Sequence, residues 1–225
     1  MVKYTMPEIL VQYRMEIWES IGQTFIMVGM SILAAVIIGL PVGTLLFLSR
    51  KGKMLENPFL FSTLNLVVNI IRSFPFLLLV VFLIPFTRIL IGTAIGTAAA
   101  TVPLSIIAIA HYSRLVEQSL LEVPKGVIEA AISMGASVKE VIFKFLYVEA
   151  RSGLVLGLTT SIISFISYST IMGVVGGGGI GDFAIRYGYQ QFKTDLMIYM
   201  IIIMVILVQA IQFTGTAIAK ILDKR

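Results

Sequence analysis

The stretch that decides the fold is "SIGQTFIMVGMSILAAVIIGLPVGTLLFLS", residues 20–49, which contains no Lys, Arg, Asp or Glu. A helix rises about 1.5 Å per residue and the hydrocarbon core of a bilayer is about 30 Å thick, so about 20 apolar residues can cross it. The stretch therefore predicts a transmembrane helix. The composition agrees, because 58% of the chain is hydrophobic and only 13% is charged, whereas a soluble domain is roughly half apolar and a quarter charged.

Four further segments predict membrane-spanning helices, and only the first of them contains a charge, Arg72. We therefore expect an all-α, polytopic membrane protein whose residues 1–225 form a single transmembrane domain. The expected spans are residues 20–49, 57–87, 89–113, 152–180 and 196–219. Ahead of the first span, Thr5 and Glu8 have the spacing of a capping box, which favours either a short interfacial helix or an extension of the span.

The distribution of Lys and Arg predicts the orientation. Most of these residues fall in three segments on one side of the membrane, namely residues 50–53, 114–151 and 220–225. Loops rich in Lys and Arg stay in the cytoplasm. With an odd number of spans, the N-terminus is expected outside and the C-terminus inside.

The stretch "GVVGGGGIGDFA", residues 173–184, contains the G-x-G-x-x-G spacing of dinucleotide-binding loops. That fingerprint must follow a short strand and open a helix. Here a long uncharged segment precedes it, and the loop is expected outside, so the match is accidental. The glycines are expected to end the fourth helix, to adopt positive φ angles and to allow close packing. A structural turn and an outer gate are the two interpretations.

Several kinds of chemistry are excluded by residues that the chain lacks. It has no cysteine and one histidine, His111, so a disulfide, a cysteine nucleophile and a multi-histidine metal site are excluded. No catalytic residue set is recognisable, and no G-x-x-x-x-G-K-[ST] motif for nucleotide phosphates occurs. The acidic residues are expected outside the spans or at their edges, which disfavours ion coupling. Energy for any transport must then enter through a partner chain.

The longest polar connection, residues 114–151, is expected on the cytoplasmic side. Apolar residues recur at helical spacing on both sides of Gly135, and Ser137 and Glu140 form a capping box for the second helix. The sequence predicts two short helices joined at a glycine. They either form a docking platform for a partner or lie on the lipid surface.

The same loop carries a family resemblance. "EAAISMG", residues 129–135, resembles the EAA loop of ABC-importer permeases, whose pattern is E-A-A, three residues, then G. Val148 and Ser152 stand where proline is common in the family, which weakens the expected break before the fourth span. "NIIRSFPFLLLVVFLIPFTR" and "GVVGGGGIGDFAIRYGYQ" resemble the methionine-importer permeases in particular.

The resemblance implies the fold of type I ABC-importer permeases, with five spans per subunit, in the bacterial cytoplasmic (inner) membrane. It implies a homodimer, two cytoplasmic ATPase subunits that bind ATP and Mg²⁺, and an extracytoplasmic substrate-binding lipoprotein, with no cofactor in this chain. The coupling residues that it implies are Glu129, Ala130, Ala131, Ser133, Met134, Gly135 and Ala136.

Two groups of residues are candidates for the translocation pathway. The first is Arg72, the one charge inside a span, with Ser73 and Phe74 before Pro75, which kinks the helix. The second is a face of the fourth span formed by Ser161, Ser164, Tyr168 and Met172. The alternatives are a structural arginine and a small-residue packing face.

The function expected from the sequence is the membrane subunit of an ATP-driven amino-acid importer, most specifically for methionine. Another apolar or polar amino acid is an alternative substrate. A non-catalytic channel or membrane scaffold, whose inner loop binds some other partner, is the alternative from a different class. Co-purification with an ATPase discriminates between them.

Overall fold

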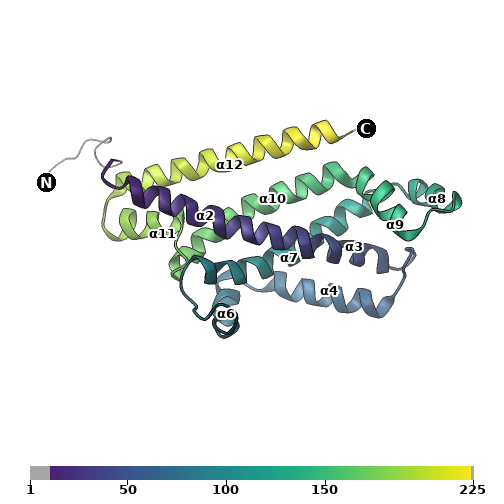
Figure 1. The fold of residues 1–225 in the computed structure, drawn as a ribbon, viewed down its shortest axis with the longest axis horizontal. Coiled ribbons are helices and arrows are strands. Elements are labelled where there is room, and N and C mark those ends of the chain that lie inside the picture. The colour runs from purple at the N-terminus through teal and green to yellow at the C-terminus, as the bar shows by residue number, and fades with distance from the viewer. Residues whose placement is uncertain (1–10, 224–225) are drawn as a thin grey trace. The chain divides into compact units, whose positions relative to one another are not determined.

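Within residues 11–223, which the computed structural model of the chain describes, all regular secondary structure is helical (Figure 1). The α-helices up to the long central helix are α2 (Arg14–Ala34), α3 (Leu40–Ser49), α4 (Pro58–Ser73), α5 (Phe76–Phe82), α6 (Ile84–Ile91) and α7 (Thr97–Leu121). Those that follow are α8 (Lys125–Ser133), α9 (Val138–Glu140), α10 (Tyr147–Val174), α11 (Ile180–Phe183) and α12 (Thr194–Leu222). Three π-helical segments, η1 (Ala35–Gly39), η2 (Val141–Leu146) and η3 (Ala184–Gln190), continue neighbouring helices without a break.

Four of the helices in the described residues are long and apolar enough to cross a membrane, and α4 with α5 is a bent fifth candidate. The four run over Arg14–Ser49, Thr97–Leu121, Val138–Val174 and Thr194–Leu222. The expected all-α, polytopic architecture is confirmed. Residues 11 and 12 are already helical, ahead of a turn at Tyr13 and the start of α2 at Arg14, while Thr5 and Glu8 lie outside the described residues.

The boundaries of the second and third spans differ from those expected. We expected residues 57–87 and 89–113, divided at Arg88, but Arg88 lies inside α6 and the third long helix is α7. The division falls at Gly92, whose left-handed φ of +83° ends α6. An exposed arginine costs little at a helix end near the interface, whereas a left-handed residue cannot continue a helix.

The second span is broken at the expected proline. Phe74 and Pro75 have ψ angles of 131° and 126°, so the helix stops at Ser73 and starts again at Phe76. Proline has no N–H to donate and disfavours the helical conformation of the residue before it. The predicted kink is therefore a complete interruption of the helix.

The described chain divides into two compact units, and the division falls inside α2, α7, α10 and α12. Unit 1 comprises residues up to Ser31, Pro75–Ile106 and Ile162–Ile211. Its core cluster contains Ile17 from α2, Ile180 and Phe183 from α11, and Leu196 and Met200 from α12. This core fixes the segment between α10 and α12 against the first helix.

The glycine loop of unit 1 is a tightly held turn. Gly176, Gly178 and Gly179 have φ angles of +84°, +76° and +94°, which favour glycine. The Gln23 side chain accepts the Gly179 N–H at 2.7 Å, and the Thr24 hydroxyl accepts the Ile180 N–H at 2.9 Å. The loop follows a helix, as expected, and its hydrogen bonds support the interpretation as a structural turn.

Unit 2 comprises Ile32–Phe74, Ile107–Ser161 and the residues from Gln212 onward. A core cluster of Leu46, Val68 and Ala110 joins α3, α4 and α7. Gly43 lets α3 approach α7, because a side chain there would meet the Ser113 carbonyl and the Val116 side chain. This unit contains every segment that the charge distribution places in the cytoplasm.

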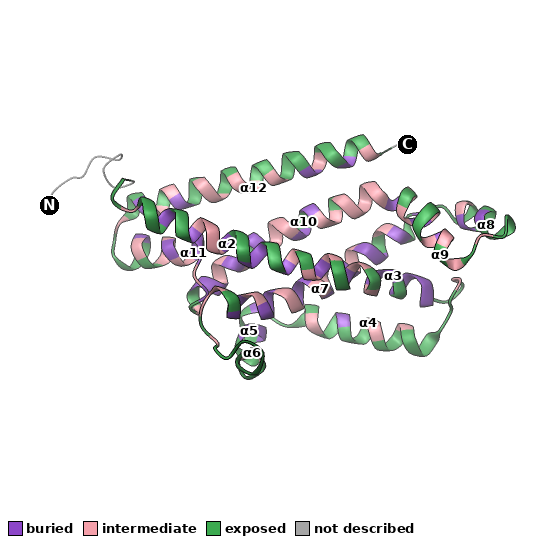
Figure 2. Cartoon of the chain, viewed as in Figure 1, coloured by how far each residue is buried: buried purple, intermediate pink, exposed green. Residues whose placement is uncertain are grey.

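Large apolar side chains remain exposed on the outer helices, and Figure 2 shows α4 and α12 largely in the colour of exposed residues. Phe59 on α4 is 82% exposed, and Ile206 and Phe213 on α12 are 63% and 71% exposed. Such helices suit a lipid environment or further protein subunits.

Candidate functional site

Helix α8 presents one face of the EAA segment to solvent and packs the other. Ile128 and Ala131 are buried, and α8 contacts η2. Glu129, Ala130, Ser133 and Met134 are exposed. The alanine at position 131 is fully buried, so its small side chain allows close packing of the helix while its neighbours remain accessible.

Gly135 ends α8 in a Schellman motif. Its φ is +81°, its N–H donates to the Ile132 carbonyl at 2.9 Å, and the Ala136 N–H donates to the Ala131 carbonyl at 3.1 Å. This geometry satisfies the last carbonyls of the helix and requires a left-handed residue after it. The spacing of E-A-A and G thus has a physical reason, because the glycine fixes where α8 stops.

The helix after Gly135 begins with the predicted capping box. The Ser137 hydroxyl accepts the Glu140 N–H, and the Glu140 carboxylate accepts the Ser137 N–H at 3.0 Å. The expectation of a second short helix is wrong, however, because α9 continues through η2 into α10 as one helix, Val138–Val174. No proline interrupts it at Val148 or Ser152.

Exposed apolar side chains gather on both sides of this glycine. Ile132 is 47% exposed, Met134 71% and Phe143 65%. Lys144, beside Phe143, forms an ion pair with Glu140 at 2.9 Å. An apolar centre with charged neighbours is typical of a protein interface.

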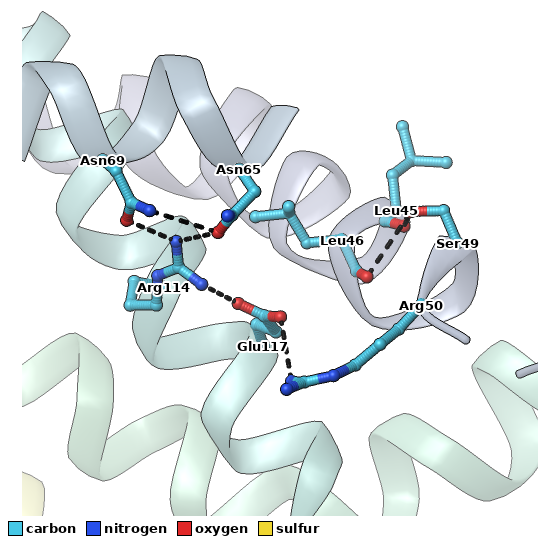
Figure 3. Close-up of polar contacts among 8 residues, drawn as sticks. All are labelled: Leu45, Leu46, Ser49, Arg50, Asn65, Asn69, Arg114 and Glu117. Carbon is cyan, nitrogen blue, oxygen red and sulfur yellow. Dashed lines mark hydrogen bonds and ion pairs between the residues drawn. The ribbon is translucent and has the colours of Figure 1, made fainter. Parts of the chain in front are cut away.

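A buried ion cluster holds together the helices next to this surface (Figure 3). The Glu117 side chain, on α7, is only 2% exposed and pairs with Arg114 and, at 3.5 Å, with Arg50. The Arg114 guanidinium also donates to the side-chain oxygens of Asn65 and Asn69, on α4, at 2.7 Å each. The cluster therefore links α3, α4 and α7.

Sequence reasoning missed this cluster. Arg114 was assigned to the cytoplasmic loop and every acidic residue to the outside or the edge of a span, but both Arg114 and Glu117 lie inside α7. The i, i+3 spacing of Arg114 and Glu117, which suits an ion pair on one helix, was the available signal.

The first group of pathway candidates lies at the end of α4. Arg72, Ser73 and Phe74 are all exposed. The Ser73 hydroxyl donates to the Asn69 carbonyl at 2.8 Å, and Arg72 has no ion pair within residues 11–223. The arginine is therefore not fixed by a carboxylate in the described chain.

The second group lies along α10. Ser161 is buried and its hydroxyl donates to the Gly157 carbonyl at 2.8 Å. Ser164 is partly buried, and the Tyr168 ring stacks on Phe76 with centroids 4.7 Å apart. Met172 is 2% exposed and lines a cavity of about 30 Å³. Met172 is one of several residues that line this small cavity.

Comparison with known proteins places this geometry in a family. Residues 35–225 match the family described as "Binding-protein-dependent transport system inner membrane component". The chain is 44% identical over 203 residues to the "Probable D-methionine transport system permease protein MetI" of Vibrio cholerae, covering 90% of each protein. It is 44% identical over 181 residues to the "Methionine import system permease protein MetP" of Bacillus subtilis, covering 80% of this chain and 82% of that protein.

A solved structure shares the fold. It is described as an inward-facing conformation of the MetNI methionine ABC transporter, and a chain in it superposes with a TM-score of 0.92 at 39% identity. The match covers 95% of this chain and 99% of that chain.

Proposed function

Because this chain belongs to the family of binding-protein-dependent transport system inner membrane components, and among them to the methionine permeases, we propose that it forms the membrane pathway of an ATP-driven methionine importer. It is the permease component, and the ATPase of the importer is a separate subunit.

The observation that carries the proposal is the shape of α8 and its glycine end. Glu129, Ala130, Ser133, Met134 and Gly135 are exposed together, and Ala131 holds the helix in place from the buried side. Ala136 closes the turn. Glu129, Ala130, Ser133, Met134, Gly135 and Ala136 form the ATPase-coupling surface, and the buried Ala131 supports it from below. Since the helix that begins at Val138 is continuous to Val174, one helix joins the segment after the coupling residues to Ser161, Ser164, Tyr168 and Met172.

The complete importer contains a second copy of this chain, two cytoplasmic ATPase subunits and an extracytoplasmic substrate-binding lipoprotein. The exposed apolar residues of α4 and α12 support burial against lipid and the second copy. ATP and Mg²⁺ are bound by the ATPase subunits, and this chain carries no cofactor of its own.

The protein is a multi-pass component of the inner membrane. The N-terminus lies outside and the C-terminus lies in the cytoplasm, and the cytoplasmic segment 114–151 carries the EAA motif on α8, between the end of α7 and the helix that begins at Val138. The concentration of Lys and Arg in the loops of unit 2 supports this orientation.

Arg72, Ser73 and Phe74 line the pathway together with Ser161, Ser164, Tyr168 and Met172. The break at Pro75 supports this role for the first group, because an interrupted helix frees polar backbone groups that need a cavity or protein partners. The complete burial of Met172 supports its role as an apolar plug.

The test is uptake of labelled methionine by the complex reconstituted with its ATPase and binding protein. Uptake must require ATP, and excess unlabelled methionine must compete better than other apolar amino acids. The chain without the ATPase subunits is expected to hydrolyse no ATP. Robust hydrolysis by this chain alone, or uptake that is independent of ATP, would contradict the proposal.

A further inference from the structure

A pocket of about 610 Å³ opens in unit 2 beside α8. One wall is the segment after α3, from Arg50 to Met54, and the opposite wall is α8, from Lys125 to Ile132. Phe47, Leu121 and Leu146 line its apolar part. The pocket is large enough for the headgroup and glycerol of a lipid, and of the proposed coupling residues only Glu129 lines it.

The charges around this pocket are unbalanced. Arg50, Lys51, Lys53 and Lys125 line it, against one carboxylate, Glu129. Lys51 and Lys125 have no ion pair within the described chain, and Arg50 shares its partner Glu117 with Arg114.

The surroundings of Lys53 lower its pKa, partly through this excess of positive charge. Its ammonium lies 4.4 Å from the centre of the Phe47 ring. Burial, and then the charges of Lys125 and Arg50, lower the pKa of Lys53 from its usual value. A bound anion would offset the repulsion among these cations.

The position of the pocket in the fold indicates which class of anionic molecule it would bind. Phe47 lies in the last turn of α3, Leu121 is the last residue of α7, and Leu146 ends η2 just before α10. Phe47 lies at the cytoplasmic end of the first expected span, and Leu121 and Leu146 lie in the segment 114–151 that we place in the cytoplasm. Cations next to apolar side chains at this level suit a molecule with a phosphate at one end and hydrocarbon at the other.

We propose that this pocket binds the phosphate headgroup of an anionic phospholipid from the cytoplasmic leaflet. Lys53 and Lys125 contact the phosphate, and Phe47 and Leu121 contact the glycerol and the first acyl carbons. Because Arg50 lies both in the pocket and beside Glu117, an occupied pocket also shifts the balance of the buried ion cluster. A free phosphate would use the cations alone and leave the apolar wall uncovered.

The experiment measures lipid binding to the full chain in neutral detergent by native mass spectrometry. The probes are dioleoylphosphatidylglycerol, dioleoylphosphatidylcholine and inorganic phosphate. The test variant is Lys53→Gln/Lys125→Gln. The control variant, Lys139→Gln/Lys220→Gln, removes the same charge from exposed positions that do not line the pocket. Both must keep the elution profile and melting temperature of the unaltered chain.

The unaltered chain is expected to bind phosphatidylglycerol more tightly than phosphatidylcholine. Removing two contacting lysines is expected to weaken phosphatidylglycerol binding roughly tenfold or more, with phosphatidylcholine binding unchanged. The control variant is expected to remain within about twofold of the unaltered chain, since its lysines lie outside the pocket.

Four results would overturn the proposal. The first is equal binding of the two lipids, and the second is equal weakening by the test and control variants. The third is displacement of phosphatidylglycerol by an equal concentration of inorganic phosphate, which would identify a site for the free ion. The fourth is normal lipid binding by the test variant together with lost co-purification of the ATPase, which would assign the pocket to the protein interface.

Discussion

Gly135 sets the end of the coupling helix through its backbone conformation alone. No other atom lies within 4 Å of the position that its Cβ would occupy, so a side chain there causes no clash within this chain. The left-handed φ of +81° is therefore the constraint. It costs other L-residues roughly 1–2 kcal/mol, and a β-branched residue tolerates it least.

We expect Gly135→Val to lower the population of the docking-competent turn roughly five- to thirtyfold. Methionine uptake per ATP hydrolysed, measured on the reconstituted complex, should fall accordingly. Gly135→Asn is the control, because asparagine tolerates the left-handed region. If the valine and asparagine variants lose coupling equally, the conformation of this residue is not what coupling requires.

Glu117 is a buried carboxylate between two arginines. We expect Glu117→Gln to lower the free energy of unfolding by about 1–3 kcal/mol, because it leaves the partly buried Arg114 without its counter-charge. Thermal unfolding of the detergent-purified chain measures this loss. Glu122→Gln, at an exposed position without an ion pair in the described residues, should leave stability nearly unchanged. Equal effects of the two substitutions would contradict a stabilising role for the cluster.

Arg72 has no ion pair in the described chain, so its guanidinium is available to bind the carboxylate of a substrate. Hydrogen bonds to charged groups contribute about 1.5–3 kcal/mol, so Arg72→Ala is expected to reduce methionine uptake roughly tenfold or more. Arg88→Ala, at another exposed arginine, is the control. A normally assembled Arg72→Ala complex with normal uptake would remove Arg72 from the pathway.

At the scale of elements, we propose that the helix from Val138 to Val174 connects the coupling surface with the pathway. We expect two glycines, in Val148→Gly/Glu149→Gly, to weaken this connection, because each costs about 1 kcal/mol relative to alanine in a helix. Uptake per ATP should fall while ATP hydrolysis continues. The variant Val148→Ala/Glu149→Ala removes the same side chains and keeps the helix, so it should behave like the unaltered chain. Equal coupling in both variants would show that stiffness here is unimportant.

The existence of the elements was predictable from the sequence, and their ends were less so. Long uncharged segments identified the spans because a bilayer tolerates little else. The divisions placed at Arg88 and Arg114 were wrong, since one arginine is exposed at a helix end and the other is neutralised inside a helix by Glu117. A charged residue does not by itself mark the end of a helix, because Arg88 is exposed within α6 and Arg114 is paired with Glu117 within α7.

At the scale of the whole molecule, the glycine that ends α8 and the capping box at Ser137 were predictable, because both are local backbone chemistry. The ion cluster was not, because Arg50, Asn65 and Glu117 come from three helices. The pocket beside α8 was missed for the same reason. In the sequence, the lysines and arginines of the pocket indicated only the orientation of the chain in the membrane.

The most direct test of the account is the accessibility of Met134. The chain has no cysteine, so Met134→Cys introduces a unique thiol on an exposed residue of the coupling surface. A membrane-impermeant maleimide should leave it unlabelled in intact cells, label it in inverted vesicles without the ATPase, and fail to label it once the ATPase is bound. Tyr189→Cys, at an exposed position in the segment expected outside, should be labelled in intact cells. Labelling of the Met134 position in intact cells would contradict the account.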